Sequence, residues 1–309
     1  MNDKTKADII FKDFWRENER FADLFNTVVF KGKEVIRPEM LQEMDTDVSG
    51  VIEFKQYKET IARTRDVVKK SAYGIEFVVL GIESQKSIHY AMPLRTMIYD
   101  ALGYLKEYQD ITRKRKKEKK ETQEEFLSNM RKEDRLHPII TIVIYYGETL
   151  WDGPFSLGDM MIEMPQEIKD IFIDYRMNLL QVRDSSQYIF QNEDVQTVFE
   201  ISREIFEEQF DKIKEQYRNR DIKSELLTVI GKITDSKAII KQGLESKEGV
   251  NMCKALENLE NQGKQKGIEE GKLEAAKVMI ENGMDLEFVA EKLNLKKELV
   301  ENFMKNTKK

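Results

Sequence analysis

The stretch that decides the fold reads IITIVIYY and covers residues 139–146. Every residue in it is β-branched or aromatic, and it begins directly after Pro138 and stops at Gly147. A continuous run of this kind is typical of a strand that is buried on both faces of a sheet. The tetrapeptide Trp151-Asp152-Gly153-Pro154 that follows predicts a turn. We therefore expect a central strand here, inside the sheet.

Two shorter strands precede this one and are predicted to form a β-hairpin. Residues 66–69 and 75–83 have strand composition, and Ala72-Tyr73-Gly74 between them suits a turn. Apolar residues recur at helical spacing over 6–30, which predicts one or two amphipathic helices packing on the sheet, and again over 88–108. Between residues 35 and 65 the periodicity is weak, and we expect a helix and a loop. Strands that alternate with helices predict an α/β core with a mixed sheet flanked by helices.

The second half of the chain has a helical composition. It is rich in Glu, Lys, Ile and Leu and contains no proline after residue 190. Gly283 predicts the end of one helix, and two short helices over 285–295 and 297–304 give a helix-turn-helix-like ending. We expect three parts: a core domain over 1–188, an all-helical region over 189–262, and a helical tail over 263–309 that serves dimerisation or DNA engagement.

The composition excludes several classes of protein. Of the 309 residues 40% are hydrophobic and 35% charged, and no stretch approaches the roughly 20 apolar residues of a membrane-spanning helix. The N-terminus lacks the apolar segment of a signal peptide, so we expect a soluble, cytoplasmic protein with no membrane partner. The single cysteine, Cys253, excludes an intrachain disulfide framework and any zinc site built from a cysteine cluster, and only two histidines, His89 and His137, remain for catalysis or metal binding. The net charge of −6 argues against a uniformly basic coat for nucleic acid, but not against a local basic patch.

The candidate site consists of polar residues at one end of the predicted hairpin. Asp66 begins the first strand, Glu83 ends the second, and Gln85 lies on the same face as Glu83 because side chains alternate along a strand. Phosphate-binding glycine motifs and the serine hydrolase motif are absent, which leaves carboxylates and a hard metal as the chemistry to consider. Two converging carboxylates with the backbone carbonyl of Ser84 suit Mg²⁺, or alternatively Mn²⁺ or Ca²⁺. The alternative is that both acids are exposed at the strand ends.

Several segments around these residues resemble, in their order, one known family. The segments are Asp8-Ile9-Ile10-Phe11-Lys12, Arg65-Asp66-Val67-Val68, Gly81-Ile82-Glu83-Ser84-Gln85, His89-Tyr90-Ala91-Met92-Pro93-Leu94-Arg95, Tyr99-Asp100-Ala101, and residues 137–147 and 151–154. They look like the Rpn family of recombination-promoting nucleases, often labelled transposases, within the PD-(D/E)xK nuclease superfamily. The resemblance covers roughly residues 6–160, and residues 266–271 with the closing helices resemble the family's tail less specifically.

This resemblance implies a restriction-endonuclease-like core and a metal-dependent DNA endonuclease. Asp66 and Glu83 would be the metal ligands, and Gln85, in the place of the superfamily's lysine, would orient the attacking water or a phosphate oxygen. Because an amide is neutral, positive charge must then come from the metal and from residues such as Lys12, Lys69, Lys86 or Arg95. Asp8 and Lys12 would contribute from the first helix, unless they are only a helix cap and a surface lysine.

Six cations are candidates for contacts with the DNA backbone: Lys86, Arg95, Arg113, Lys114, Arg115 and Lys116. The alternatives are that the run over 113–120 is a solvated linker, and that Arg95 and Tyr99 pair with acids and pack on the sheet. A homodimer would bring two active sites to the two strands of DNA. The competing hypothesis is a catalytically silent DNA-binding or interaction protein on the same fold.

Residues 45–53 match the opening of a calcium-binding EF-hand loop, with Asp45, Asp47 and Ser49 at ligand positions and Gly50 at the turn. The match fails at the twelfth position, where Gln56 replaces the bidentate glutamate. We therefore expect an ordinary turn stabilised by aspartate side chains, without calcium.

Overall fold

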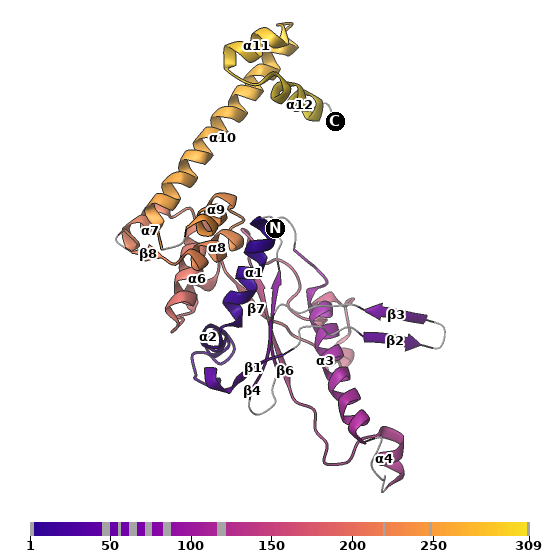
Figure 1. The fold of residues 1–309 in the computed structure, drawn as a ribbon. Helices are drawn as coiled ribbons and strands as arrows, with labels where there is room; N and C mark the ends of the chain where they lie inside the picture. Colours follow the sequence, from indigo (N-terminus) through magenta and orange to yellow (C-terminus); the bar gives the residue numbers. More distant parts are fainter. Residues whose placement is uncertain are drawn as a thin grey trace.

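The computed structural model describes residues 3–44, 50–54, 57–61, 67–71, 76–82, 88–115, 122–218, 220–246 and 249–307 (Figure 1). Helices predominate in these residues, and a five-stranded sheet is the largest of three sheets. The predicted mixed α/β class is therefore confirmed.

The large sheet is mixed. In spatial order its strands are β1 (Leu41–Glu43), β4 (Val67–Ser71), β5 (Glu76–Ile82), β6 (Ile139–Tyr145) and β7 (Asn178–Gln181). β4 is antiparallel to β1 and β5, whereas β5, β6 and β7 run parallel to one another. The predicted hairpin is confirmed as β4 and β5, and the predicted central strand is β6, which has a partner on each side.

Strand β6 is buried on both faces. Ile142, Val143 and Ile144 are fully buried, and Tyr145 is nearly so. Ile142 and Ile144 belong to one apolar cluster, while Val143 and Tyr145 belong to a second. Because successive side chains of a strand point to opposite faces, the sheet separates two cores.

The larger core joins the sheet to both ends of the sequence. Most of its helical residues come from α1 (Asp3–Arg16), α2 (Asn18–Val28), α6 (Glu193–Phe206) and α8 (Ser224–Ile233). Phe14 and Trp15 of α1 pack in the same cluster as Phe199 of α6 and Ile230 of α8. Since α1 contacts both β4 and α8, it lies between the sheet and the helical half of the chain. The predicted boundary between residues 188 and 189 falls within this continuous core.

Helix α3 (Met92–Arg115) covers the other face of the sheet, where Met92, Tyr99 and Leu102 share a cluster with Val143. The sequence predicts a helix over 88–108, and the observed one begins and ends later. Pro93 lies in the first turn, where its missing N–H is not needed. The charged residues after 108 contain no helix breaker, so the helix continues to Arg115.

The expectation of a helix and a loop over 35–65 is wrong. The described residues of this interval form a 3₁₀ turn, η1 (Pro38–Met40), then β1 and a separate antiparallel pair, β2 (Gly50–Phe54) and β3 (Tyr57–Ile61). β-branched and aromatic residues dominate this pair, and they favour strands. Residues 45–49 and Gln56 of the EF-hand-like segment lie outside the described residues, and Gly50 begins a strand.

The region after residue 189 is helical except for one small strand pair. Its remaining elements are α7 (Phe210–Gln216), β8 (Asp221–Ile222), α9 (Lys237–Glu245), β9 (Val250–Asn251), α10 (Met252–Glu281), α11 (Leu286–Leu293) and α12 (Lys297–Thr307). The expectation that this region is entirely helical is corrected by the antiparallel contact of β8 with β9, where Ile222 is buried in the larger core. Between β6 and α6 lie the short elements η2 (Gly158–Met160), α5 (Gln166–Lys169) and η3 (Ser185–Gln187).

The tail is a long helix that projects from the body and ends in a small helical cluster (Figure 1). As predicted, α10 ends before Gly283, which adopts a φ of 88° that glycine tolerates best. Leu273 and Ala276 of α10 then pack with Val289 of α11 and Val300 of α12 as a third core. In the part of the chain that the structure describes, none of the helices combines the length and apolarity needed to cross a bilayer.

The contact between α8 and α9 supplies a stability prediction. A Cβ atom at Gly231 would lie 2.6 Å from the backbone nitrogen of Ile240, so Gly231→Ala forces the two helices apart. We expect a loss of about 1–3 kcal/mol in the free energy of unfolding, measured by urea denaturation. Gly271→Ala in α10 is the matched control, because nothing lies within 4 Å of its Cβ position and no loss is expected. Equal loss in both variants would contradict this explanation.

Candidate functional site

The register of the β4–β5 hairpin determines where its two ends lie. Val67 is opposite Val79, and Lys70 is opposite Glu76. The end of the hairpin where the chain passes from β4 to β5 therefore lies between Ser71 and Glu76, and we call it the closed end. The opposite, open end lies where β4 begins at Val67 and β5 ends at Ile82.

The predicted metal ligands adjoin this open end in the sequence. Asp66 directly precedes β4, and Glu83 directly follows β5. Six predicted site residues lie outside the described residues: Asp66, Glu83, Ser84, Gln85, Lys86 and Lys116. Their metal-binding, catalytic and DNA-binding roles therefore stay predictions, which the positions of the flanking strands can only support.

Strand β6 and helix α1 reach the same edge of the sheet. Ile82, the last residue of β5, is paired with Tyr145, the last residue of β6. The next residue, Tyr146, is buried, and its ring makes an edge-to-face contact with Phe11 of α1, with 5.3 Å between the ring centroids. Asp8 is one turn before Phe11, and Lys12, which is half-buried, follows it. The side chain of Asp8 lies outside the described residues, so only the backbone of α1 is placed near this edge.

Two segments of the family-like pattern are neighbours in space. Ile88 packs in the same cluster as Trp151, and a Cβ atom at Gly153 would lie 2.7 Å from Cγ2 of Ile88. This close approach explains why glycine occupies position 153. A cavity of about 590 Å³ adjoins the contact, with Tyr90 and Asp152 among its lining residues.

Lys69 is not available to a phosphate, because it is buried on the α1 side of the sheet. It is 1% exposed, and its Nζ donates to the backbone oxygen of Arg16 and to Oδ1 of Asn18. The ammonium also lies 5.2 Å from the centroid of the Phe21 ring. Asn18 in turn donates to the backbone oxygens of residues 38 and 41, so Lys69 stabilises the junction of α1, α2 and β1.

Of the described cations predicted to contact DNA, three have partners within the chain. Nε of Arg95 donates to the hydroxyl of Tyr99 at 3.0 Å. Tyr99 packs on the sheet as the alternative expected, but Arg95 is exposed and bonds this hydroxyl instead of an acid. Arg113 pairs with Asp110 at 3.2 Å and stays 75% exposed, whereas Arg115 pairs with Asp134 at 2.7 Å and is mostly covered. The hydrogen bond from Arg115 lowers the pKa of Asp134. Lys114 is exposed, and Lys116 lies outside the described residues.

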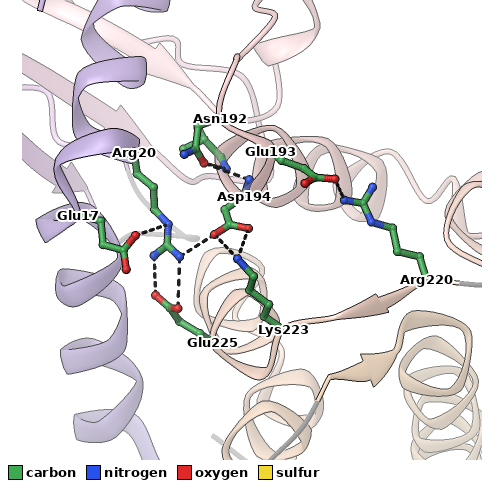
Figure 2. A network of polar contacts seen from close by, with 9 residues as sticks. Glu17, Arg20, Asn192, Glu193, Asp194, Arg220, Lys223 and Glu225 are labelled. Carbon is green, nitrogen blue, oxygen red and sulfur yellow. Dashed lines mark hydrogen bonds and ion pairs between the residues drawn. The ribbon is translucent and has the colours of Figure 1, made fainter. Parts of the chain in front are cut away.

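The structure also contains a buried cation that sequence reasoning missed (Figure 2). Arg20 of α2 is 3% exposed and pairs with Asp194 at 2.7 Å and Glu225 at 2.6 Å, while Glu17 lies 3.5 Å away. Its guanidinium lies 4.5 Å from the centroid of the Phe14 ring. Burial alone would lower the pKa of Arg20, but the bonds to the two acids outweigh burial and raise it.

The partners of Arg20 are 174 and 205 residues away, so no local pattern could identify them. One signal was present in the sequence. Arg20, Asp23 and Thr27 recur at helical spacing beside the apolar face of α2, and all three are buried. In the sequence such a stripe is typical of a solvated helix face, and only the burial of all three side chains shows that it belongs to a hydrogen-bonding network.

A second buried network holds α3 on the sheet. Asp100 is 6% exposed and accepts hydrogen bonds from Thr141 of β6 at 2.7 Å and from the hydroxyl of Tyr175 at 2.5 Å. Burial and the adjacent carboxylate raise the pKa of Tyr175 far above its usual range. The tyrosine therefore stays protonated and serves as a donor.

Neither a metal cluster nor a relative identifies the function. Within the described residues, no three or more His, Cys, Asp or Glu side chains are grouped so that they could hold a metal ion. Comparison of the chain with protein-family models, curated proteins and solved structures finds no match. The residues and the geometry of the sheet edge are therefore the basis for the function.

Lys69 predicts a specific dependence of stability on pH. Burial lowers its pKa to about 8, whereas an unfolded lysine has a pKa of about 10.4. Between these values the unfolded chain holds more protons, so the contribution of Lys69 to stability rises with pH. Lys69→Met should therefore lose up to about 3 kcal/mol relative to wild type as the pH rises from about 7 to 10.5, measured by urea denaturation. Lys70→Met is the matched control, and parallel profiles for Lys69→Met and wild type would contradict the assignment.

Arg20 should be essential for stability. Arg20→Met leaves the carboxylates of Asp194 and Glu225 without their shared cation, and we expect a loss of about 2–4 kcal/mol. Arg113→Met removes an exposed ion pair and should cost less than about 1 kcal/mol. Thermal and urea unfolding of the two variants would measure the difference. A small effect at Arg20 would mean that apolar packing alone holds α2 against α6 and α8.

Proposed function

We propose that this chain is a Mg²⁺-dependent endodeoxyribonuclease with a PD-(D/E)xK-like core, as its resemblance to the Rpn family implies. One observation carries the proposal. The antiparallel register of β4 with β5, and the parallel pairing of β5 with β6, bring the open end of the hairpin, the carboxyl end of β6 and Phe11 of α1 to one edge of the sheet. Asp66 and Glu83 adjoin that edge in the sequence.

The chemistry of the proposed ligands fits the ion. Asp66, Glu83 and the backbone carbonyl of Ser84 supply hard oxygen atoms, which Mg²⁺ prefers and Mn²⁺ or Ca²⁺ also accept. When bound, the ion would polarise the scissile phosphate and make a water more acidic. Gln85 would orient the attacking water through its amide. Because Lys69 is occupied in the core, Lys12 on α1 is the better candidate for the cation near the phosphate.

The proposed substrate is double-stranded DNA. Arg113 and Lys114 are exposed at the end of α3 and suit phosphate contacts, to which Lys86, Arg95 and Lys116 would add. Arg115 would instead stabilise this end of α3 through Asp134. A homodimer would place one active site on each strand, and the small helical cluster at the end of α10 is a candidate for the dimer contact.

A catalytically silent DNA-binding or interaction protein is the second candidate. The observation that favours it is Gln85, because an amide cannot supply the charge of the lysine in the superfamily pattern. This candidate predicts binding to DNA without cleavage, and no effect of Asp66→Ala or Glu83→Ala on that function.

Cleavage of supercoiled plasmid tests the proposal. Wild-type protein should nick plasmid with Mg²⁺ or Mn²⁺ and fail to do so in EDTA. Asp66→Ala and Glu83→Ala should each lower the rate more than about 100-fold. Glu76→Ala, at the closed end of the same hairpin, is the matched control and should cut normally. Nicking that survives Glu83→Ala at the wild-type rate would contradict the site, and plasmid binding without any cutting would favour the silent protein.

A further inference from the structure

The end of α3 and the helix that follows it form a projecting element, which we call the α3–α4 tip and define as residues 113–115 and 122–135. Helix α4 (Gln123–Ser128) lies at the end of the molecule remote from α10 (Figure 1). The tip belongs to none of the three cores of the described residues. The apolar residues of the tip therefore do not contribute to the hydrophobic cores that stabilise the rest of the protein.

Helix α4 is nonetheless held in a defined position. The hydroxyl of Thr122 accepts a hydrogen bond from the backbone N–H of Glu125 at 3.2 Å, which caps the start of the helix. Asn129 closes its end in the left-handed conformation with a φ of 53°. The hydroxyl of Tyr108 in α3 donates to the backbone oxygen of Ser128 at 2.9 Å. Together with the ion pair of Arg115, these contacts hold α4 in a fixed position at the end of α3.

The helix presents apolar side chains to water. Phe126 is 64% exposed and the adjacent Leu127 is 73% exposed. Large apolar side chains that stay mostly exposed on a capped surface element indicate a contact with another molecule, because their burial there would stabilise a complex.

The charge around these side chains indicates what that molecule is. The tip as defined contains six Lys and Arg against four Asp and Glu, a net charge of +2 in a chain whose total is −6. Lys114, Lys132 and Arg135 are exposed on the tip. A local basic element on an acidic protein selects a polyanion. Two apolar residues are too few for stable attachment to a lipid surface, whereas one or two suffice as a wedge between base pairs.

We propose that the α3–α4 tip is a DNA-engaging wedge, in which Lys114, Lys132 and Arg135 contact phosphates while Phe126 and Leu127 insert between bases. The inference rests on the proposed function in taking DNA as the partner, and it adds how the duplex is held. Partial unstacking of a base step would bend the DNA and fix its position on the protein.

Binding without cleavage tests the wedge. The full chain, in EDTA, is titrated against a short duplex that carries a fluorescent base analogue sensitive to unstacking. Wild type should bind and raise the fluorescence. The double variant Phe126→Ala/Leu127→Ala should bind about tenfold more weakly and lose the fluorescence rise, with an unchanged salt dependence. Lys132→Glu should instead reduce the dependence of affinity on salt.

Ile162→Ala/Ile173→Ala is the matched control, because these side chains are 87% and 91% exposed but lie outside the tip. It should bind DNA as wild type does. Wild-type affinity and fluorescence in Phe126→Ala/Leu127→Ala would overturn the wedge, even if the plasmid is cut normally. Binding of wild type to anionic vesicles but not to DNA would overturn it in favour of a lipid surface. A tip-dependent fluorescence rise without plasmid cutting would support the wedge and refute the nuclease.

Discussion

Two buried cations fix the junction between α1 and α2, and the layers on both sides of it depend on them. Lys69 reaches the junction from the sheet and donates to the backbone oxygen of Arg16. Arg20 extends from the junction in the other direction and pairs with Asp194 and Glu225 in the helical half. A charge that is removed from water costs several kcal/mol unless its hydrogen bonds are satisfied. The sheet, the first two helices and the helical half are therefore held in one arrangement.

That arrangement also determines what reaches the candidate site. Strand β6 can be buried on both faces only because α3 covers one face and α1, which packs against α8 on its far side, covers the other. The contact of Phe11 with Tyr146 then brings α1 to the carboxyl end of β6. The chemistry proposed for this edge thus depends on packing from three distant parts of the sequence. Two elements project from the compact body, the α3–α4 tip and the α10 helix (Figure 1).

The sequence predicted the elements that have a strong local signature. The central strand and the hairpin are predicted by runs of β-branched and apolar residues bounded by turn residues, and the first helices by apolar residues at helical spacing. The closing helices are predicted by their composition and by the Gly283 stop. The interval over 35–65 failed, since short strands such as β2 and β3 contain too few residues to show a period. The acids of the candidate site were chosen by residue type and spacing, and the described strands agree with their placement at one edge without testing their roles.

The sequence by itself therefore determined the order and type of most elements, and which acids adjoin the open end of the hairpin. Only the tertiary structure decided that Lys69 is a buried structural cation and not a ligand for phosphate. It also decided that Arg20 binds acids 174 and 205 residues away, and that the helical half shares a core with the sheet. The physical reason is that periodicity reports which side of an element is apolar. It does not report which distant surface covers that side. That surface decides whether a cation is removed from water and paired inside the protein, or stays exposed and able to bind a phosphate.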